Sequence, residues 1–114
     1  MDKIIIEGNN HLEGTVKISG AKNAVLPIMT AALMVDGKSI ISKVPNLRDT
    51  RTMIKLLNIV GADCNLEGDL LTIDGSKANN PEAPYDLVKT MRASFYVLGP
   101  LLARFGYVKV SLPG

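Results

Sequence analysis

A short motif near the N-terminus combines residue types that bind small anions. SGAKN occupies residues 19–23, between an alternating segment and a long apolar one. Glycine permits a tight turn, and a helix start offers unpaired N–H groups and the positive end of the helix dipole. Lys22 adds a full charge there, and Asn23 can cap the helix or donate its amide to a ligand. The motif favours a phosphate or carboxylate site; the alternative is an exposed lysine beside an ordinary helix start.

Other residues with chemical potential are scattered along the chain. Arg92 carries a forked guanidinium that suits phosphate and carboxylate oxygens, although a surface arginine in an ion pair is the simpler interpretation. Cys64 is the single cysteine, which excludes an internal disulfide and a multi-cysteine zinc site and suits a reducing cytoplasm. We interpret Cys64 as a small buried hydrophobic residue and His11 as a surface residue in a turn. The sequence therefore predicts no metal site.

The elements that would position these residues follow from hydrophobic periodicity. Residues 3–7 and 15–19 are predicted strands, followed by a helix that starts near Asn23 and ends before Gly37. Because residues 24–35 are apolar on nearly every face, we expect this helix to be covered on nearly every side. A strand over residues 39–44 and an amphipathic helix over residues 50–60 come next. One face of the helix over residues 50–60 carries the apolar residues Met53, Leu56, Leu57 and Val60.

The second half of the chain predicts a hairpin and another helical region. Residues 63–66 and 70–73 form the expected hairpin, and the polar residues 76–84 resemble a linker. Residues 85–105 have a helical pattern interrupted at Gly99 and Pro100, where a helix must kink or restart.

A strand over residues 107–112 and a turn at Pro113 and Gly114 complete the predicted elements. When the sequence is aligned with itself so that Gly37 matches Gly106, two apolar helical segments coincide, each followed by a predicted strand. This weak repeat predicts that the natural protein continues.

Composition limits the classes of function. The chain has 114 residues, 46% of them hydrophobic and 4% aromatic, so the core must consist mainly of aliphatic side chains and methionine. A net charge of +2 without a basic run disfavours nucleic-acid binding. The longest apolar stretch is too short to cross a bilayer, and the N-terminal one is too short for a signal peptide. We therefore expect a soluble cytoplasmic protein without membrane or nucleic-acid partners.

Several motifs together resemble those of the UDP-N-acetylglucosamine enolpyruvyl transferases. The chain matches that family in SGAKNA at residues 19–24, APYDLVKTMRAS at 83–94, ARFG at 103–106 and SLPG at 111–114. The motifs span the chain, and KTMRAS at that distance from Lys22 is specific. A sister enolpyruvyl transferase that acts on shikimate 3-phosphate shares the fold, but the KTMRAS stretch favours the nucleotide-sugar family.

The resemblance implies roles for residues that the motifs contain. Lys22 and Asn23 would contact phosphoenolpyruvate, with Asn23 also near the sugar, and Arg92 would contact the UDP-sugar. Asp49 is a further candidate that is either structural or near the sugar. Lys89 and Arg104 match the family pattern but receive no catalytic role.

The implied reaction is transfer of the enolpyruvyl group of phosphoenolpyruvate to the 3-hydroxyl of UDP-N-acetylglucosamine, with release of phosphate. This is the first committed step of peptidoglycan synthesis, and it requires no metal or organic cofactor. The family's acid catalyst, a cysteine on a mobile loop, is expected just after Gly114, a position that Cys64 does not match. The chain thus contains no catalytic residue of its own, and alone it is expected to be inactive.

The resemblance also implies an α+β fold of the inside-out barrel type, built from repeated βαβαββ units in two similar domains. Residues 1–21 would be strands of the second domain, and residues 22–114 the first part of the domain that carries the catalytic loop. The chain would be one full unit plus the start of a second, with the remainder of the same enzyme as its partner. Two other classes stay open: a non-catalytic anion- or nucleotide-binding module, and an RNA-processing relative, which low charge and few aromatics disfavour.

Overall fold

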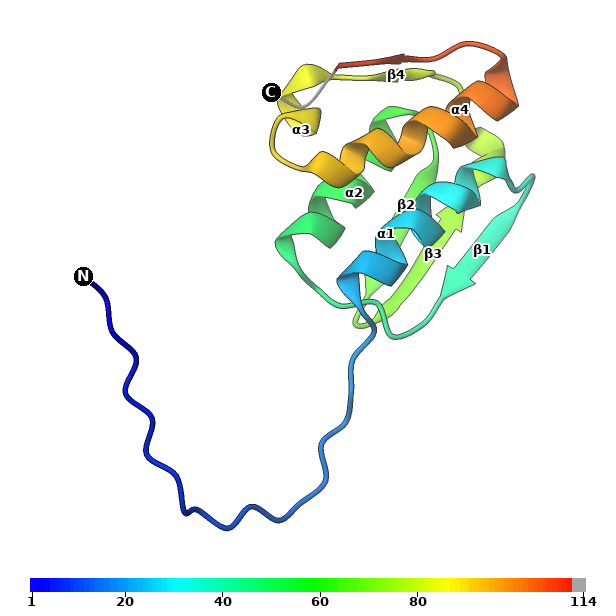
Figure 1. The fold of residues 1–114 in the computed structure, drawn as a ribbon. Coiled ribbons are helices and arrows are strands. Elements are labelled where there is room, and N and C mark those ends of the chain that lie inside the picture. Colours follow the sequence, from blue (N-terminus) through cyan, green and yellow to red (C-terminus); the bar gives the residue numbers. More distant parts are fainter. Residues whose placement is uncertain (112–114) are drawn as a thin grey trace.

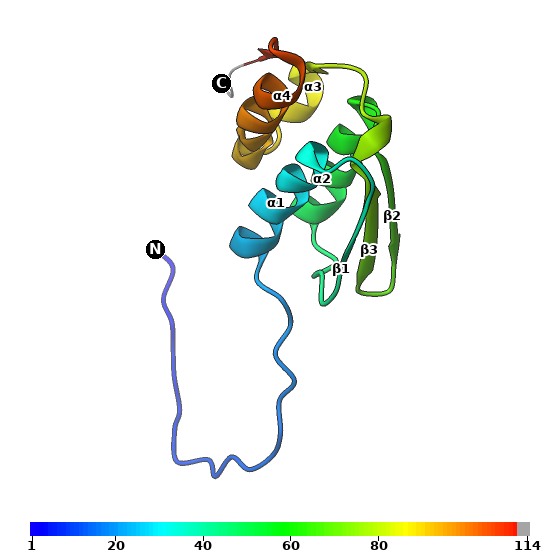
Figure 2. The same ribbon diagram turned by 90° about the vertical axis from the view of Figure 1, so that its right-hand side faces the viewer.

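The computed structural model describes residues 1–111, and the chain from Lys22 onward folds into three layers. A three-stranded sheet forms the first layer, two helices pack on one of its faces, and further helical segments lie on the opposite side of those helices (Figures 1 and 2). In chain order the elements are α1 (Lys22–Ala31), the 3-10 helix η1 (Ala32–Met34), β1 (Lys38–Ile41), α2 (Arg48–Ile59), β2 (Asp63–Glu67), β3 (Leu70–Asp74), the 3-10 helix η2 (Gly75–Lys77), β4 (Glu82–Ala83), α3 (Tyr85–Val88), the 3-10 helix η3 (Arg92–Val97), α4 (Leu98–Phe105) and β5 (Lys109–Val110).

The sheet confirms the predicted hairpin. Its strand order is β1-β3-β2, and both pairings are antiparallel. Strands β2 and β3 meet at Glu67 and Leu70 across a tight turn in which Gly68 has a φ of 60°, a conformation that glycine adopts without a steric penalty. Alternation along β3 buries Leu71 and Ile73 fully, toward the helices. Period-two patterning therefore identified both strands of the hairpin.

The core lies between the sheet and the helices. Helix α2 buries the predicted face, and the neighbouring helix α1 contributes Leu26 and Met29 to the core. The buried hydrophobic residues of the described chain are all aliphatic or methionine, as composition predicted. The largest fully buried side chains are Leu26, Met29, Leu33, Met53, Leu56, Leu57, Leu71, Ile73, Leu101, Val44, Val60 and Val88.

The first twenty residues do not form the two predicted strands. They run away from the folded part without strand pairing (Figure 1), and their apolar side chains, such as Ile5 and Ile18, are exposed. A strand needs a partner for its backbone N–H and C=O groups, and none of the described residues supplies one for this segment. The chain rejoins the fold at Gly20, whose N–H donates to the carbonyl of Lys43 at 3.1 Å.

Helix α1 begins where the motif predicted but differs in two details. A proline is best accommodated near the first turn of a helix, but Pro27 is the sixth residue of α1. The helix buries Leu26 and Met29 yet leaves Ile28 51% exposed, so it is not covered on every side by the described residues. Its buried side faces neighbours that include α2 and η3.

The C-terminal helical region restarts at Leu98, next to the predicted Gly99 and Pro100, and has an additional break before it. It divides at residues 89–91, between α3 and η3, whereas Gly99 and Pro100 lie in the first turn of α4. Proline is tolerated there because the first N–H groups of a helix have no intrahelical acceptor. Strand β4 arises inside the predicted linker and pairs in parallel with β5, the observed part of the predicted strand over residues 107–112. The expected turn at Pro113 and Gly114 lies outside the described residues.

Candidate functional site

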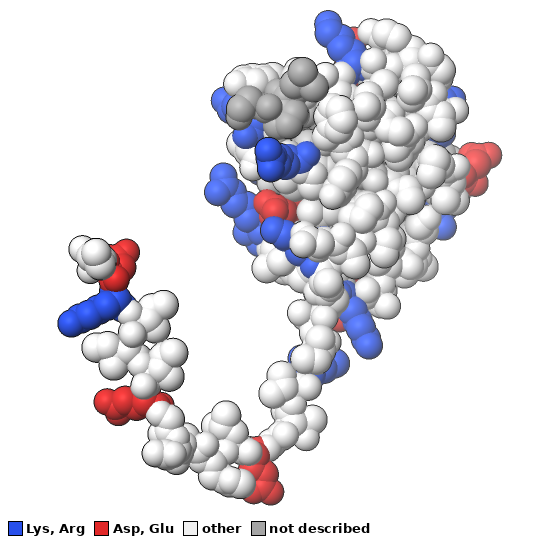
Figure 3. All heavy atoms as spheres, viewed as in Figure 1, with Lys and Arg blue, Asp and Glu red and all other residues white. Residues whose placement is uncertain are grey.

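A cavity of about 540 Å³ opens where the first turns of α1 and α2 meet the segment between α3 and η3. Polar residues from all three segments line it, and Leu26 and Tyr96 are among its apolar walls. Figure 3 shows basic side chains gathered along one flank of the folded part. The structure thus brings together all four candidate residues of the sequence, which are Lys22, Asn23, Asp49 and Arg92.

The start of α1 supplies two of these residues. Ala21 is the N-cap, with extended backbone angles and without a side-chain capping bond. Of the two roles that the sequence left open for Asn23, capping does not occur, because Asn23 is already the second helical residue. Its side chain lines the cavity instead, beside that of Lys22. The first N–H groups of a helix have no intrahelical acceptor, so this end of α1 provides donors as well as charge.

Lys22 forms an ion pair across the cavity wall. Its Nζ lies 3.1 Å from Oδ2 of Asp49, the second residue of α2. Both side chains are partly exposed, at 43% and 31%. The pair links the starts of two helices that pack against each other. Asp49 therefore lies at the site, in direct contact with Lys22.

Arg92 reaches the same cavity from a distant part of the chain. It is the first residue of η3, which packs on α1. No ion pair of residues 1–111 involves Arg92, so its guanidinium keeps its donors for another partner. The three planar nitrogens of arginine suit the paired oxygens of phosphate or carboxylate groups. Lys22 at the start of α1 and Arg92 at the start of η3 can therefore each bind an anion in the cavity.

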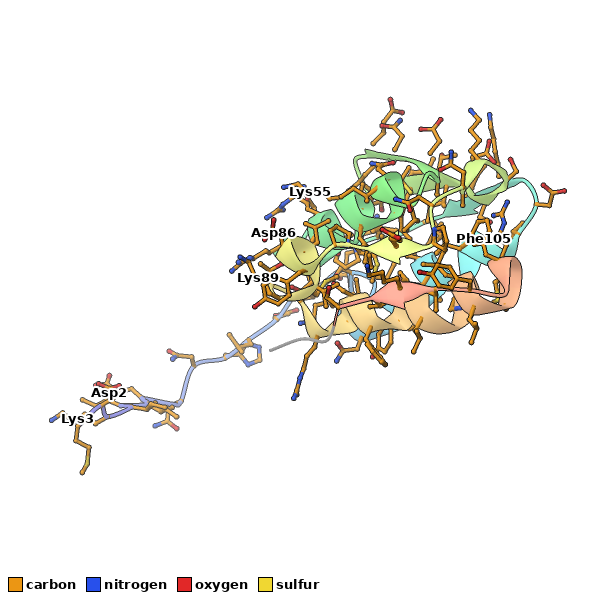
Figure 4. All side chains as sticks on the ribbon, turned by 90° about the horizontal axis from the view of Figure 1, so that it is seen from above. Asp2, Lys3, Lys55, Asp86, Lys89 and Phe105 are labelled. Carbon is orange, nitrogen blue, oxygen red and sulfur yellow. The ribbon has the colours of Figure 1, made fainter. Side chains whose placement is uncertain are left out.

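Sequence reasoning missed other residues of the cavity wall, chiefly Lys89 and Thr90. Lys89 Nζ lies 3.5 Å from Oδ1 of Asp86 and 5.6 Å from the centre of the Tyr85 ring. Figure 4 shows Lys89 and Asp86 side by side at one end of the folded part. Both missed residues belong to the KTMRAS motif that also contains Arg92. Their position within that motif was the signal that could have indicated them.

Cys64 lies on β2, away from the cavity, and its environment makes it unreactive. Burial, helped by the negative charge of Asp63, raises the pKa of Cys64 to about 12. A thiol is a nucleophile or an acid catalyst only when its pKa is near the working pH. The sequence predicted a small buried hydrophobic residue at Cys64, and the structure leaves this side chain partly buried.

Arg104 also lies away from the cavity, where it joins three backbone segments. Its guanidinium donates to the carbonyls of Leu33 at 2.8 Å, of Ser76 at 3.0 Å and of Gly75. These contacts connect α4 to η1 and η2. A side chain on Gly75 would collide with the carbonyl of Ala32, so glycine permits this close approach. The structure gives Arg104 a role in holding the fold together.

Two further features of the described residues bear on function. His11 is exposed, and its Nε2 lies 3.7 Å from Oε2 of Glu13. No group of three or more metal-ligating side chains occurs among residues 1–111. Among the helices of those residues, none is both long enough and apolar enough to cross a bilayer.

Comparison with known proteins shows the family to which the chain belongs. The model of the EPSP synthase family (3-phosphoshikimate 1-carboxyvinyltransferase) matches residues 6–114. The chain belongs to the EPSP synthase family. This membership confirms the α+β fold class, since the structure mixes helices with a sheet.

Three curated relatives of this chain share a more specific name. Over its whole length the chain is 55% identical to proteins named UDP-N-acetylglucosamine 1-carboxyvinyltransferase from Chloroherpeton thalassium and Dichelobacter nodosus, and 54% identical to one from Shewanella amazonensis. The chain covers 27% of each of these relatives. Among solved structures, the enolpyruvyl transferase NikO from Streptomyces tendae is similar, with a TM-score of 0.75 and 30% identity. That similarity covers 87% of this chain and 23% of NikO.

Proposed function

We propose that the full-length protein containing this chain transfers the enolpyruvyl group of phosphoenolpyruvate to the 3-hydroxyl of UDP-N-acetylglucosamine, with release of phosphate. The observation that carries the proposal is the cavity, which gathers Lys22, Asn23 and Arg92 from separate segments. The names of relatives with 55% identity support this substrate pair over shikimate 3-phosphate. The reaction belongs to peptidoglycan synthesis, and we propose a cytoplasmic location, which a single cysteine suits.

The charges of the cavity fit two anionic substrates. Lys22 and Asn23 contact phosphoenolpyruvate in this proposal, with Asn23 also near the sugar, and Arg92 contacts the UDP-sugar. An ammonium at a helix start gives phosphate or carboxylate oxygens a charge together with backbone donors. The guanidinium of Arg92 can form two parallel hydrogen bonds to one phosphate or carboxylate group. Prearranged cations of this kind stabilise the negative charge that develops during the reaction.

The proposed chemistry is addition followed by elimination. The sugar oxygen bonds to C2 of phosphoenolpyruvate as its proton leaves to a base, and an acid protonates C3, which gives a tetrahedral intermediate. The bond from C2 to the phosphate oxygen then breaks, and loss of a proton from C3 restores the double bond. The acid in this proposal is a cysteine that follows Gly114, and no metal or organic cofactor takes part.

We also propose that the two parts of the chain serve different domains of the full-length protein. Residues 1–21 would add strands to a second domain, and residues 22–114 would begin the domain with the catalytic loop. Exposed isoleucines at Ile4, Ile5 and Ile6 support a partner for the first part, because such a run of apolar side chains is costly in water.

Turnover by the full-length protein tests the proposed function. Phosphate release should require phosphoenolpyruvate together with UDP-N-acetylglucosamine, and shikimate 3-phosphate should not replace the sugar. Release with shikimate 3-phosphate alone as acceptor would establish the sister activity. Binding of both ligands without any release would support a binding module and contradict the proposal.

A further inference from the structure

The two side chains of the ion pair between Lys22 and Asp49 differ in how firmly they are held in place. Asp49 sits in the first turn of α2, where the helix dipole favours a negative charge. Helix α2 is fixed by Met53, Leu56 and Leu57, all fully buried. Lys22 instead carries its charge on a flexible four-carbon stem with many rotamers. The carboxylate is therefore the fixed member of the pair, and the ammonium is the member that it orients.

The composition of the cavity wall separates this pair from the other basic residues. Asp49 is the one acidic residue among those that line the cavity, against three basic ones, Lys22, Lys89 and Arg92. Lys89 has its own carboxylate partner, Asp86, which does not line the cavity. Asp49 thus directs one particular ammonium without cancelling the positive charge of the wall.

We propose that Asp49 is the positioning residue for Lys22, which fixes the ammonium at the place where the phosphate or carboxylate of phosphoenolpyruvate binds. An ammonium has three N–H donors, so the bond to Asp49 leaves two that are available for a substrate. This inference rests on the proposed function. A displacement of about 1 Å in a catalytic group can lower the rate about 100-fold, so the orientation of a flexible lysine matters for turnover.

A double-mutant cycle in the full-length protein tests this role. Asp49→Ala should lower kcat about 10- to 100-fold, and Lys22→Ala at least as much. If Asp49 acts only through Lys22, the double variant should match Lys22→Ala within about twofold. Asp49→Glu keeps the charge and should recover part of kcat, and Asp49→Asn, which keeps one acceptor oxygen, should lie between Ala and wild type.

The matched control is the ion pair between Lys77 and Asp63, which is 3.7 Å long and outside the cavity. Asp63→Ala should leave kcat within about twofold of wild type, and thermal unfolding checks that every variant folds. The positioning role is refuted if Asp49→Ala keeps kcat within about twofold, or if the losses of the two single variants multiply in the double variant. A purely structural salt bridge would shift unfolding without this non-additivity.

A second readout separates this inference from the proposed function. If wild-type protein shows no transfer, the proposed function fails, and the pairing is then judged by NMR of reductively ¹³C-methylated lysines. The Lys22 signal should shift and narrow in Asp49→Asn as its side chain gains freedom, while the Lys77 signal stays unchanged. A Lys22 signal that does not respond would overturn the positioning role.

Discussion

Arg104 offers the most quantitative test of how this fold is held together. Its guanidinium donates to the carbonyls of Leu33, Gly75 and Ser76, which ties α4 to η1 and η2. The bonds to Leu33 and Gly75 are partly buried, whereas the bond to Ser76 is exposed. In Arg104→Ala water can replace the donor at Ser76 but reaches the other two carbonyls poorly. The carbonyl of Leu33 is then left without a donor, at a cost of about 1–3 kcal/mol, whereas that of Gly75 loses a charged hydrogen bond but keeps the N–H of Ala78. We therefore expect a total loss of about 3 kcal/mol in the free energy of unfolding.

Urea unfolding followed by circular dichroism measures this loss. With a slope near 1.5 kcal/mol/M, the midpoint should fall by about 2 M. Arg51→Ala is the matched control, because Arg51 bonds only to Asn46, five residues away, at an exposed site. It should cost less than about 1 kcal/mol. If the two variants lose the same stability, or if Arg104→Ala loses less than about 1 kcal/mol, the role given to Arg104 is wrong.

Three further predictions concern buried polar groups. The hydroxyl of Thr50 is buried without a hydrogen-bond partner, so Thr50→Val should leave the free energy of unfolding unchanged or raise it by about 1 kcal/mol; a clear loss would reveal a hidden partner. Because the pKa of Cys64 rises from 9.0 to about 12 on folding, unfolding releases a proton between these values. Stability should therefore fall as pH rises through that range, and Cys64→Ala should flatten this part of the urea-midpoint profile, whereas an unchanged slope would assign it to other groups. Hydrogen bonds from Ser76, aided by the charges of Lys77 and Lys38, lower the pKa of Asp74. Stability should thus fall as pH drops below about 4, and an equally steep acid limb in Asp74→Asn would contradict this.

Local patterns predicted the elements whose partners lie close in the sequence. The hairpin of β2 and β3 could be predicted because its turn and alternation are contained in a dozen residues. The buried face of α2 could be predicted because a period of 3.6 residues records which side meets the core. The same reasoning placed the start of α1 within a residue of its observed position at Lys22.

Elements that depend on distant partners could not be predicted in this way. Residues 3–7 and 15–19 have strand patterns, yet a strand forms only with a partner, and the described residues provide none. Strand β4 could not be predicted, because its partner β5 lies beyond the whole C-terminal helical region. The break at residues 89–91 could not be predicted because no glycine or proline marks it, whereas the restart predicted at Gly99 and Pro100 lies within a residue of the start of α4 at Leu98.

The candidate site combined both kinds of information. The motifs that contain Lys22 and Arg92 identified these residues separately, and the packing of η3 on α1 brought them to one cavity. The ion pair of Lys22 with Asp49 could not be read from the sequence, since it depends on how two helix starts approach each other. The same limit applies to Lys89, whose motif was visible but whose place in the cavity wall was not.

The central claim is that this cavity binds the substrates of enolpyruvyl transfer, and Arg92→Ala in the full-length protein tests it most directly. The measurement is kcat/KM for UDP-N-acetylglucosamine, followed as phosphate release, with Lys77→Ala as a control outside the cavity. Loss of a charged hydrogen-bond pair of about 3 kcal/mol corresponds to a fall of about 100-fold. We predict that fall for Arg92→Ala and no change for the control. Unchanged kcat/KM in a folded Arg92→Ala protein would contradict the placement of the nucleotide-sugar site.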